Sequence, residues 1–214
     1  MSRTRIKICG LTQAADAICA VDAGADALGV ILYADSPRTI DLERAVEVLG
    51  DTPPLVARIG VFVDAPEDFV AEAVERIGLT AVQFHGDESP ARCAGAPLPV
   101  IRVMRVGPGF SVSDIEPYIG AVAAVLLDTY SPEARGGTGS TFPWRQLDEI
   151  SIEVPVILAG GLSAANVAEA IETVRPFAVD VASGVESSRG IKDHVAIRAF
   201  GAAVRAADAK RVDG

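Results

Sequence analysis

The chain has 214 residues, of which 50% are hydrophobic and 22% are charged, and its formal net charge is −10. The apolar fraction excludes a disordered chain, and the negative charge argues against nucleic acids and anionic membranes as partners. No apolar run approaches the roughly 18 residues of a transmembrane helix. Three cysteines without CxxC spacing, Cys9, Cys19 and Cys93, favour free thiols in a reducing cytoplasm over a disulfide framework.

Apolar runs rich in Val, Ile and Ala alternate along the chain with segments of helical character. Continuous apolar runs of this kind predict strands that are covered on both faces, as in a parallel sheet. In chain order the predicted strands are 5–9, 27–32, 55–63, 81–84, 100–106, 122–127, 156–158 and 178–181. The predicted helices are 12–23, 42–49, 66–77, 88–94, 113–118, 144–150, 164–174 and 194–207. Thr12 and Ser163 are the candidate N-caps of two of these helices, and the polar residues 208–214 are expected to fray.

Eight strands and eight helical segments alternate strictly, so right-handed crossovers leave either an open doubly wound sheet or a closed barrel. Eight similar units favour the barrel. The 214 residues give about 27 residues per unit, which is near the short end for this fold and leaves no room for a second domain. We therefore predict an α/β protein in which residues 1–214 form a single-domain (β/α)8 TIM barrel with eight parallel strands.

Active sites of such barrels lie at the C-terminal ends of the strands. Asp128 ends the run Ala-Val-Leu-Leu, where burial would raise the pKa of a carboxyl and suit it to proton donation. Alternatively, Asp128 braces the loop that follows through Thr129 and Ser131. Cys9 ends the first strand; its thiolate could act as a base or nucleophile, or the thiol could be a small buried hydrophobic group.

Glycine clusters follow the last three predicted strands, and they indicate a phosphate site. Backbone N–H groups in such loops can approach an oxyanion closely, and barrels commonly bind phosphate after strands seven and eight. Donors of this kind need no basic surface, which reconciles an anionic ligand with the net charge. The candidate phosphate-binding residues are Gly137, Thr138, Gly139, Gly160, Gly161, Ser183 and Gly184.

Other polar residues near the strand ends have two or more interpretations. Arg38, in the loop after the second strand, is either a bidentate clamp for a carboxylate or a solvated loop residue. Lys7 points inward by strand alternation and is expected to pair with Asp180 across the barrel. Gln83 and His85 share the inward face of the fourth strand; His85 is a base, a hydrogen-bond donor or a residue of the site wall.

A series of short motifs runs through almost the whole chain. Lys-Ile-Cys-Gly-Leu-Thr at 7–12 opens it, and residues 36–38, 60–62, 83–86, 126–129, 136–139, 159–162 and 181–186 continue it in order. Together these motifs resemble the phosphoribosylanthranilate isomerase family of tryptophan biosynthesis. The opening cysteine motif combined with the aspartate motif is highly specific.

The resemblance implies an Amadori rearrangement of N-(5-phosphoribosyl)anthranilate to 1-(o-carboxyphenylamino)-1-deoxyribulose 5-phosphate, without a metal or an organic cofactor. By this resemblance Asp128 is the general acid that protonates the furanose oxygen, and Cys9 is the thiolate base that takes the proton from C2. Arg38 matches the arginine that binds the anthranilate carboxylate, and the glycine clusters match the phosphate site. The protein is then a cytoplasmic monomer or homodimer that binds a phosphorylated small molecule.

Two alternatives remain. A sugar-phosphate isomerase of histidine biosynthesis, or a bifunctional isomerase, is a related barrel, but those enzymes carry an aspartate in place of Cys9 and usually show two similar halves. A non-catalytic phosphate-binding barrel would keep the glycine loops but would not need both Cys9 and Asp128.

Overall fold

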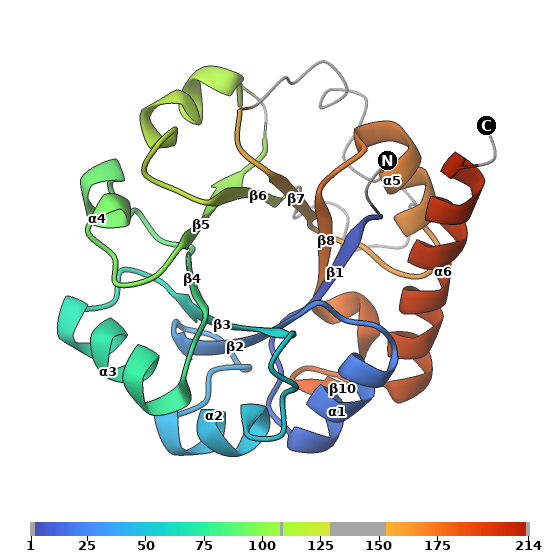
Figure 1. Ribbon diagram of the computed structural model, residues 1–214, viewed down its shortest axis with the longest axis horizontal. Helices are drawn as coiled ribbons and strands as arrows, with labels where there is room; N and C mark the ends of the chain where they lie inside the picture. The colour runs from blue at the N-terminus through green and yellow to red at the C-terminus, as the bar shows by residue number, and fades with distance from the viewer. Residues whose placement is uncertain (1–2, 108, 129–152, 213–214) are drawn as a thin grey trace.

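The computed structural model describes residues 3–107, 109–128 and 153–212. In these ranges eight strands close into one barrel in the order β1 to β8, and each pairing between neighbours is parallel. Figure 1 shows the strands as a ring and the helices around it. The predicted α/β TIM barrel is therefore confirmed. No helix within the described residues is long and apolar enough to cross a membrane.

The barrel strands are β1 (Arg5–Ile8), β2 (Ala27–Tyr33), β3 (Ala57–Phe62), β4 (Ala81–Phe84), β5 (Val100–Arg105), β6 (Ala124–Asp128), β7 (Val156–Ala159) and β8 (Ala178–Val181). Every predicted strand is present, with ends that differ by one or two residues. The start of β3 comes two residues later than predicted, because Val56 N donates to Pro53 O at 3.0 Å and so belongs to a turn instead of the strand.

The helices are α1 (Ala14–Asp22), α2 (Leu42–Leu49), α3 (Glu67–Ile77), α4 (Pro90–Ala94), α5 (Val167–Val174) and α6 (His194–Val212). Three 3-10 turns are η1 (Val112–Asp114), η2 (Glu116–Tyr118) and η5 (Ser183–Val185). An antiparallel hairpin that was not predicted follows β8, formed by β9 (Glu186–Ser188) and β10 (Ile191–Lys192). The predicted helix 144–150 lies outside the described residues.

The sequence predicts Asp193 as the N-cap of the last helix, and its Oδ1 accepts from Val195 N and Ala196 N, whereas the predicted N-caps Thr12 and Ser163 are wrong. The helix α1 begins after Gln13, and the Thr12 hydroxyl donates instead to the carbonyl oxygen of Gly190 at 2.6 Å. The helix α5 begins after Asn166, whose Oδ1 accepts a hydrogen bond from the backbone N–H of Ser163 at 2.8 Å. In each of these two cases the polar group forms a hydrogen bond with a partner that the sequence spacing does not reveal.

The two ends of the fold are tied together more firmly than expected. The helix α6 continues past residue 207 to Val212, so the expected fraying is wrong for residues 208–212. Asp208 in this segment accepts hydrogen bonds from the backbone N–H and the hydroxyl of Thr4, both at 2.7 Å. The segment 113–118, expected as one helical turn, instead forms the two 3-10 turns η1 and η2.

The apolar core has two layers, which follow from the alternation of side chains along each strand. One layer lies between the strands and the surrounding helices and contains, for example, Leu28, Leu127 and Leu158. The other fills the barrel itself with Ile59, Ile101, Val103, Ala124, Leu126, Ile157, Ala159 and Ala178. Lys7, Gln83 and Asp180 are buried on the same inward faces. These three buried polar side chains lie toward the C-terminal ends of β1, β4 and β8.

Candidate active site

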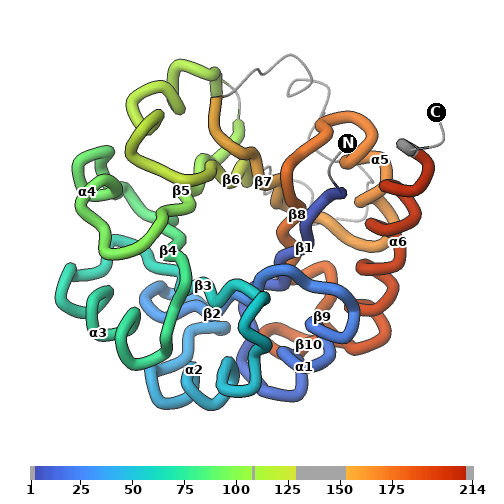
Figure 2. Tube along the Cα trace, in the orientation of Figure 1, coloured from blue at the N-terminus to red at the C-terminus, as the bar shows by residue number. Residues whose placement is uncertain are grey.

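The candidate acid and base lie at the C-terminal ends of two strands that are not neighbours. Cys9 directly follows β1, and Asp128 is the last residue of β6. In the barrel β1 pairs with β2 and β8, whereas β6 pairs with β5 and β7. Since all eight strands run in the same direction, the C-terminal ends of β1 and β6 lie at one mouth of the barrel. Figure 2 shows these two strands at different places around the ring.

Asp128 faces His85, which directly follows β4. The distance between His85 Nε2 and Asp128 Oδ2 is 3.7 Å, and the side chains are 29% and 23% exposed. Burial lowers the pKa of His85, with Asp128 opposing this effect and the positive charge of Arg105 adding to it. The imidazole is consequently neutral near pH 7. Both groups remain accessible to a ligand in the mouth.

Cys9 is buried on the opposite side. Its backbone N–H donates to Val181 O of β8 at 2.9 Å, which fixes the residue beside the last strand. Burial raises the pKa of the Cys9 thiol, and it outweighs the positive charge of Lys7, which lowers this pKa. Gly10 comes next with φ +71°, and a Cβ at this position would lie 2.6 Å from Cδ of Arg38. Only glycine both adopts this backbone conformation easily and leaves room for the arginine.

The predicted pairing of Lys7 with Asp180 is confirmed, in a different place from the one expected. The distance between Lys7 Nζ and Asp180 Oδ1 is 3.0 Å, and the side chains are 3% and 9% exposed. The two residues are direct partners in the register of the adjacent strands β1 and β8, so the pair does not span the barrel. It instead lies along the line where the first and last strands meet.

Arg38 is not a solvated loop residue. Its Nε and Nη2 donate to the two carboxylate oxygens of Glu186, both at 2.7 Å. The same carboxylate accepts from Lys192 Nζ at 3.1 Å, and Lys192 also donates to Ala182 O at 2.9 Å. A guanidinium has five N–H donors, so the two used here leave others for a carboxylate ligand. The arginine is thus held in position by the hairpin that follows β8.

Two of the glycine loops expected to bind phosphate are brought into direct contact. Gly160 and Gly161, after β7, have φ of +91° and +65°. Gly184, after β8, packs so closely that a Cβ there would overlap the carbonyl oxygen of Leu162. Ser183 begins the turn η5 beside it. The third expected group, Gly137, Thr138 and Gly139, lies outside the described residues.

Gln83 adds a further polar group to the site. Gln83 is buried on the inward face of β4, and within the described part of the chain its Oε1 has no hydrogen-bond partner. It therefore contributes a polar group beneath the mouth, next to the position of His85. No group of three His, Cys, Asp or Glu side chains in the described ranges is arranged to hold a metal ion.

Comparison with known proteins agrees with this arrangement. Residues 6–203 match the family model of N-(5′-phosphoribosyl)anthranilate (PRA) isomerase. The chain belongs to this family. An N-(5′-phosphoribosyl)anthranilate isomerase from Pseudomonas putida (strain W619) is 46% identical over 207 residues, which cover 97% of this chain and 100% of that relative.

Solved structures of the family have the same barrel. The phosphoribosyl anthranilate isomerase of Thermotoga maritima superposes with a TM-score of 0.85 at 38% identity, covering 95% of this chain and 99% of that one. A second structure was solved in complex with reduced 1-(o-carboxyphenylamino)-1-deoxyribulose 5-phosphate. It has a TM-score of 0.80 at 35% identity, with coverage of 95% and 99%. These family members thus include one that binds a phosphorylated analogue of the reaction product.

Glu186 and Lys192 were missed by reasoning from the sequence. Glu186 ends the family motif at 181–186, in which the serine and the glycine are the predicted phosphate-binding residues. An acidic residue that ends a glycine-containing strand-end motif could have been considered as a partner for Arg38. Lys192 gave no such signal, because it belongs to the two-residue strand β10 and no motif surrounds it.

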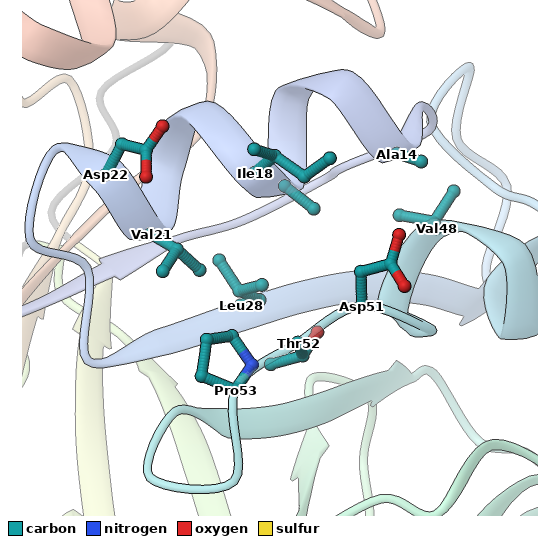
Figure 3. A pocket seen from close by; sticks show the side chains of 10 residues that line it. Ala14, Ile18, Val21, Asp22, Leu28, Val48, Asp51, Thr52 and Pro53 are labelled. Carbon is teal, nitrogen blue, oxygen red and sulfur yellow. The ribbon is translucent and has the colours of Figure 1, made fainter.

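A cavity of about 300 Å³ on the flank of the barrel has a different character. It lies between α1, α2 and residues 51–53, and its wall is mainly apolar, with Ile18, Val21 and Leu28 prominent (Figure 3). None of the candidate acid, base or anion-binding residues lines it. Residues 51–53 lead into the start of β3, so the cavity is not at the end of the barrel where the family's candidate residues gather.

Proposed function

We propose that this chain catalyses the rearrangement of N-(5′-phosphoribosyl)anthranilate to 1-(o-carboxyphenylamino)-1-deoxyribulose 5-phosphate, a step of tryptophan biosynthesis. The observation that carries the proposal is the placement of a thiol and a carboxyl on different sides of one barrel mouth, after β1 and at the end of β6. Membership of the isomerase family supports the same reaction. General acid–base catalysis needs just such a pair with a substrate between them.

The reaction begins at the carboxyl group. Asp128 donates its proton to the furanose ring oxygen as the bond between C1 and that oxygen breaks. The nitrogen lone pair forms the C1=N bond, which gives a protonated Schiff base and an open sugar chain. The partial exposure of Asp128 supports this role, because the ring oxygen must come within hydrogen-bond distance of the carboxyl.

The thiolate of Cys9 then takes the proton from C2. The electrons of the C–H bond form the C1=C2 bond of an enolamine, and those of C1=N return to the nitrogen. The enol hydroxyl loses its proton and C1 gains one, which gives the ketone of the product. The contrast between a buried thiol on which the charges of Lys7 and Lys192 act and an acid in a more open site supports this division of roles.

Two anionic groups of the substrate find complementary donors. The anthranilate carboxylate binds the free edge of the Arg38 guanidinium, which Glu186 already holds in place. The phosphate binds backbone N–H groups around Gly160, Gly161, Ser183 and Gly184, together with Gly137, Thr138 and Gly139. These local donors make an overall positive surface unnecessary, in agreement with the net charge of −10.

The alternatives have less support. An isomerase of histidine biosynthesis would carry an aspartate at the position of Cys9, and a non-catalytic barrel has no need for a buried thiol beside a lysine. Turnover is tested by following the loss of fluorescence of freshly generated phosphoribosylanthranilate. Folded protein that consumes it and forms the aminoketose supports the proposal; folded protein without turnover contradicts it.

The enzyme is proposed to work in the cytoplasm as a monomer or homodimer. The three cysteines are free thiols, as a reducing compartment requires. A phosphoribosyl anthranilate isomerase from Thermotoga maritima is dimeric. Light scattering coupled to size-exclusion chromatography decides between a particle of 22.2 kDa and one of twice that mass.

A further inference from the structure

Lys7 is a costly residue to place inside a barrel. Its side chain is almost fully buried, and the carboxylate of Asp180 that pairs with it is buried as well. Desolvation of a buried ion pair often costs as much free energy as the attraction returns, so apolar residues of similar volume would stabilise the fold at least as well. The pair therefore needs an explanation other than stability.

The ammonium of Lys7 and the sulfur of Cys9 lie in the same corner of the barrel interior. Lys7 is on β1, Cys9 follows two residues later on the same inward side, and the charge of Lys7 acts on the thiol. Gly29 on β2 covers both from the side: a Cβ at this position would lie 2.8 Å from Cys9 Sγ and 3.2 Å from Lys7 Nζ. The absence of a side chain at Gly29 thus leaves space for the ammonium and the sulfur to occupy the same corner.

Several charged groups act on the sulfur from different elements. Burial raises the pKa of the thiol overall; among the charges Lys7 on β1 has the largest effect, and it favours the thiolate. Asp180 on β8 opposes the thiolate, and Lys192 on β10 favours it. Arg38, after β2, also interacts with Cys9. Burial lowers the pKa of Lys7, but the charges of Asp180 and Cys9 outweigh it, so this pKa is raised and Lys7 stays protonated.

The other two cations near Cys9, Arg38 and Lys192, form hydrogen bonds with groups other than the thiol. Arg38 donates twice to Glu186, and Lys192 donates to the same carboxylate and to Ala182 O. Burial also lowers the pKa of Lys192, despite the nearby Glu186. Lys7 is the cation that is shared between one carboxylate and the sulfur.

We propose that Lys7 is a positioning residue for Cys9: its ammonium, held by Asp180, stabilises the thiolate that takes the substrate proton. Lys7 itself does not touch the reacting carbon. The inference rests on the proposed function for the role of Cys9 in turnover. Its physical content, an ammonium that favours the thiolate, is measurable without any turnover, so the two can fail separately.

The test is a titration of the Cys9 thiol by ¹³C NMR in protein labelled at the cysteine Cβ. The variants Cys19→Ser and Cys93→Ser assign the three resonances. In Lys7→Met we expect the Cys9 midpoint to rise by at least about one pH unit, the change that loss of a neighbouring opposite charge typically causes. In Lys7→Arg the charge remains, and the midpoint should stay close to that of the wild type.

Asp180→Asn gives a result of the opposite sign. Removal of the carboxylate leaves the thiolate as the anionic partner of Lys7, so the Cys9 midpoint should fall. A purely structural role predicts something else, because loss of either partner would disturb the same buried pair in the same direction. Lys7→Met and Asp180→Asn midpoints that move together, or a midpoint unchanged in Lys7→Met, would overturn the proposal.

Glu88→Gln is the matched control. Glu88 pairs with Arg102 at 3.2 Å, both side chains are buried, and the pair lies outside the barrel interior. Its loss should lower the thermal stability but leave the Cys9 midpoint in place. If Lys7→Met does not fold, Asp180→Asn decides alone: a lower midpoint supports the proposal, and an unchanged or higher one overturns it. In active protein the limb of the pH profile of kcat that reports the ionisation of Cys9 should shift in step with the NMR midpoint.

Discussion

The two sides of the barrel mouth hold their charged groups in different ways. On the side of β1 and β8, Lys7 and Asp180 are buried and in contact at 3.0 Å, and Cys9 lies beside them. On the side of β4 and β6, His85 and Asp128 are 3.7 Å apart and partly exposed. A base must be stabilised in its ionised form, whereas an acid must reach the substrate with its proton. Different surroundings can separate the two roles within one small site.

The largest effect should come from removing the acid or the base. Cys9→Ser and Asp128→Ala should each lower kcat by about 10²–10⁴-fold, because each removes a group that transfers a proton. Binding of the reduced product analogue, measured by calorimetry, should change little, since the anion sites remain. Cys19→Ser is the matched control, because Cys19 is an equally buried thiol in α1. Near-normal turnover in Cys9→Ser or Asp128→Ala would refute the role of that residue.

Arg38→Ala should act on binding instead of chemistry. A charge-assisted hydrogen bond contributes about 1.5–3 kcal/mol, so KM should rise roughly tenfold to a hundredfold with a smaller change in kcat. Steady-state kinetics with N-(5′-phosphoribosyl)anthranilate measure both constants. Arg76→Ala, which removes an exposed arginine of α3, serves as the control. If KM and kcat are both unchanged in Arg38→Ala, the arginine does not bind the substrate.

Gly29→Ala should disturb only the side of the barrel mouth that holds Cys9 and Lys7. The added methyl group would push the Cys9 sulfur and the Lys7 ammonium apart, and we expect kcat to fall roughly tenfold, since small misplacements of catalytic groups are costly. Gly60→Ala on β3 is the matched variant, because its Cβ would meet Leu79 and Phe62 at similar or shorter distances away from the mouth. Both should lower the free energy of unfolding by about 1–3 kcal/mol. A fall in kcat of the same size in both variants would contradict the expectation.

The smallest effect concerns acid stability. Burial raises the pKa of Glu186, but hydrogen bonds from Arg38 and Lys192 and the charges of these residues lower it by more. The pKa in the folded protein therefore lies below that of an unfolded glutamate. These contacts therefore stabilise the fold fully above about pH 5, and the contribution is lost as the pH falls through the folded pKa.

Thermal unfolding at several pH values tests this expectation with Glu186→Gln. The variant should melt roughly 2–4 °C below the wild type at neutral pH, corresponding to about 1 kcal/mol, and the gap should close as the pH falls from 5 to 3. Glu47→Gln, which removes an exposed ion pair with Arg44, should show little difference at any pH. A gap that widens in acid would have the wrong sign.

Local patterns were enough to predict most of the fold and the placement of the acid and base. Cys9 and Asp128 each end an apolar run, and the barrel geometry then assigns both to one mouth. The ion pair of Arg38 with Glu186 joins residues 148 positions apart, so no local pattern could indicate it. Two other contacts also join distant parts of the chain. The Thr12 hydroxyl donates to Gly190 O, and Asp208 near the end of α6 accepts from the Thr4 hydroxyl, so the sequence around each residue does not reveal its partner.

The hairpin β9–β10 was missed for a related reason. Its strands have three and two residues, too few for an alternating pattern to stand out. The hairpin is held by contacts with other elements. Lys192 N donates to Asp16 of α1 at 3.3 Å, and Glu186 accepts from Arg38. Figure 2 shows the hairpin beside α1. The hairpin is therefore specified by contacts with distant parts of the chain.

The pairing of β1 with β8 has a consequence for how the enzyme comes into being. Lys7 and Asp180 are 173 positions apart, and they meet only when the first and last strands of the ring join. Contacts of such long sequence separation are slow to form, because most of the chain must already be arranged. A partly folded barrel can hold the thiol and the carboxyl in their own strands, but it lacks the counter-charge beside the sulfur. The base is thus completed by the same event that closes the ring.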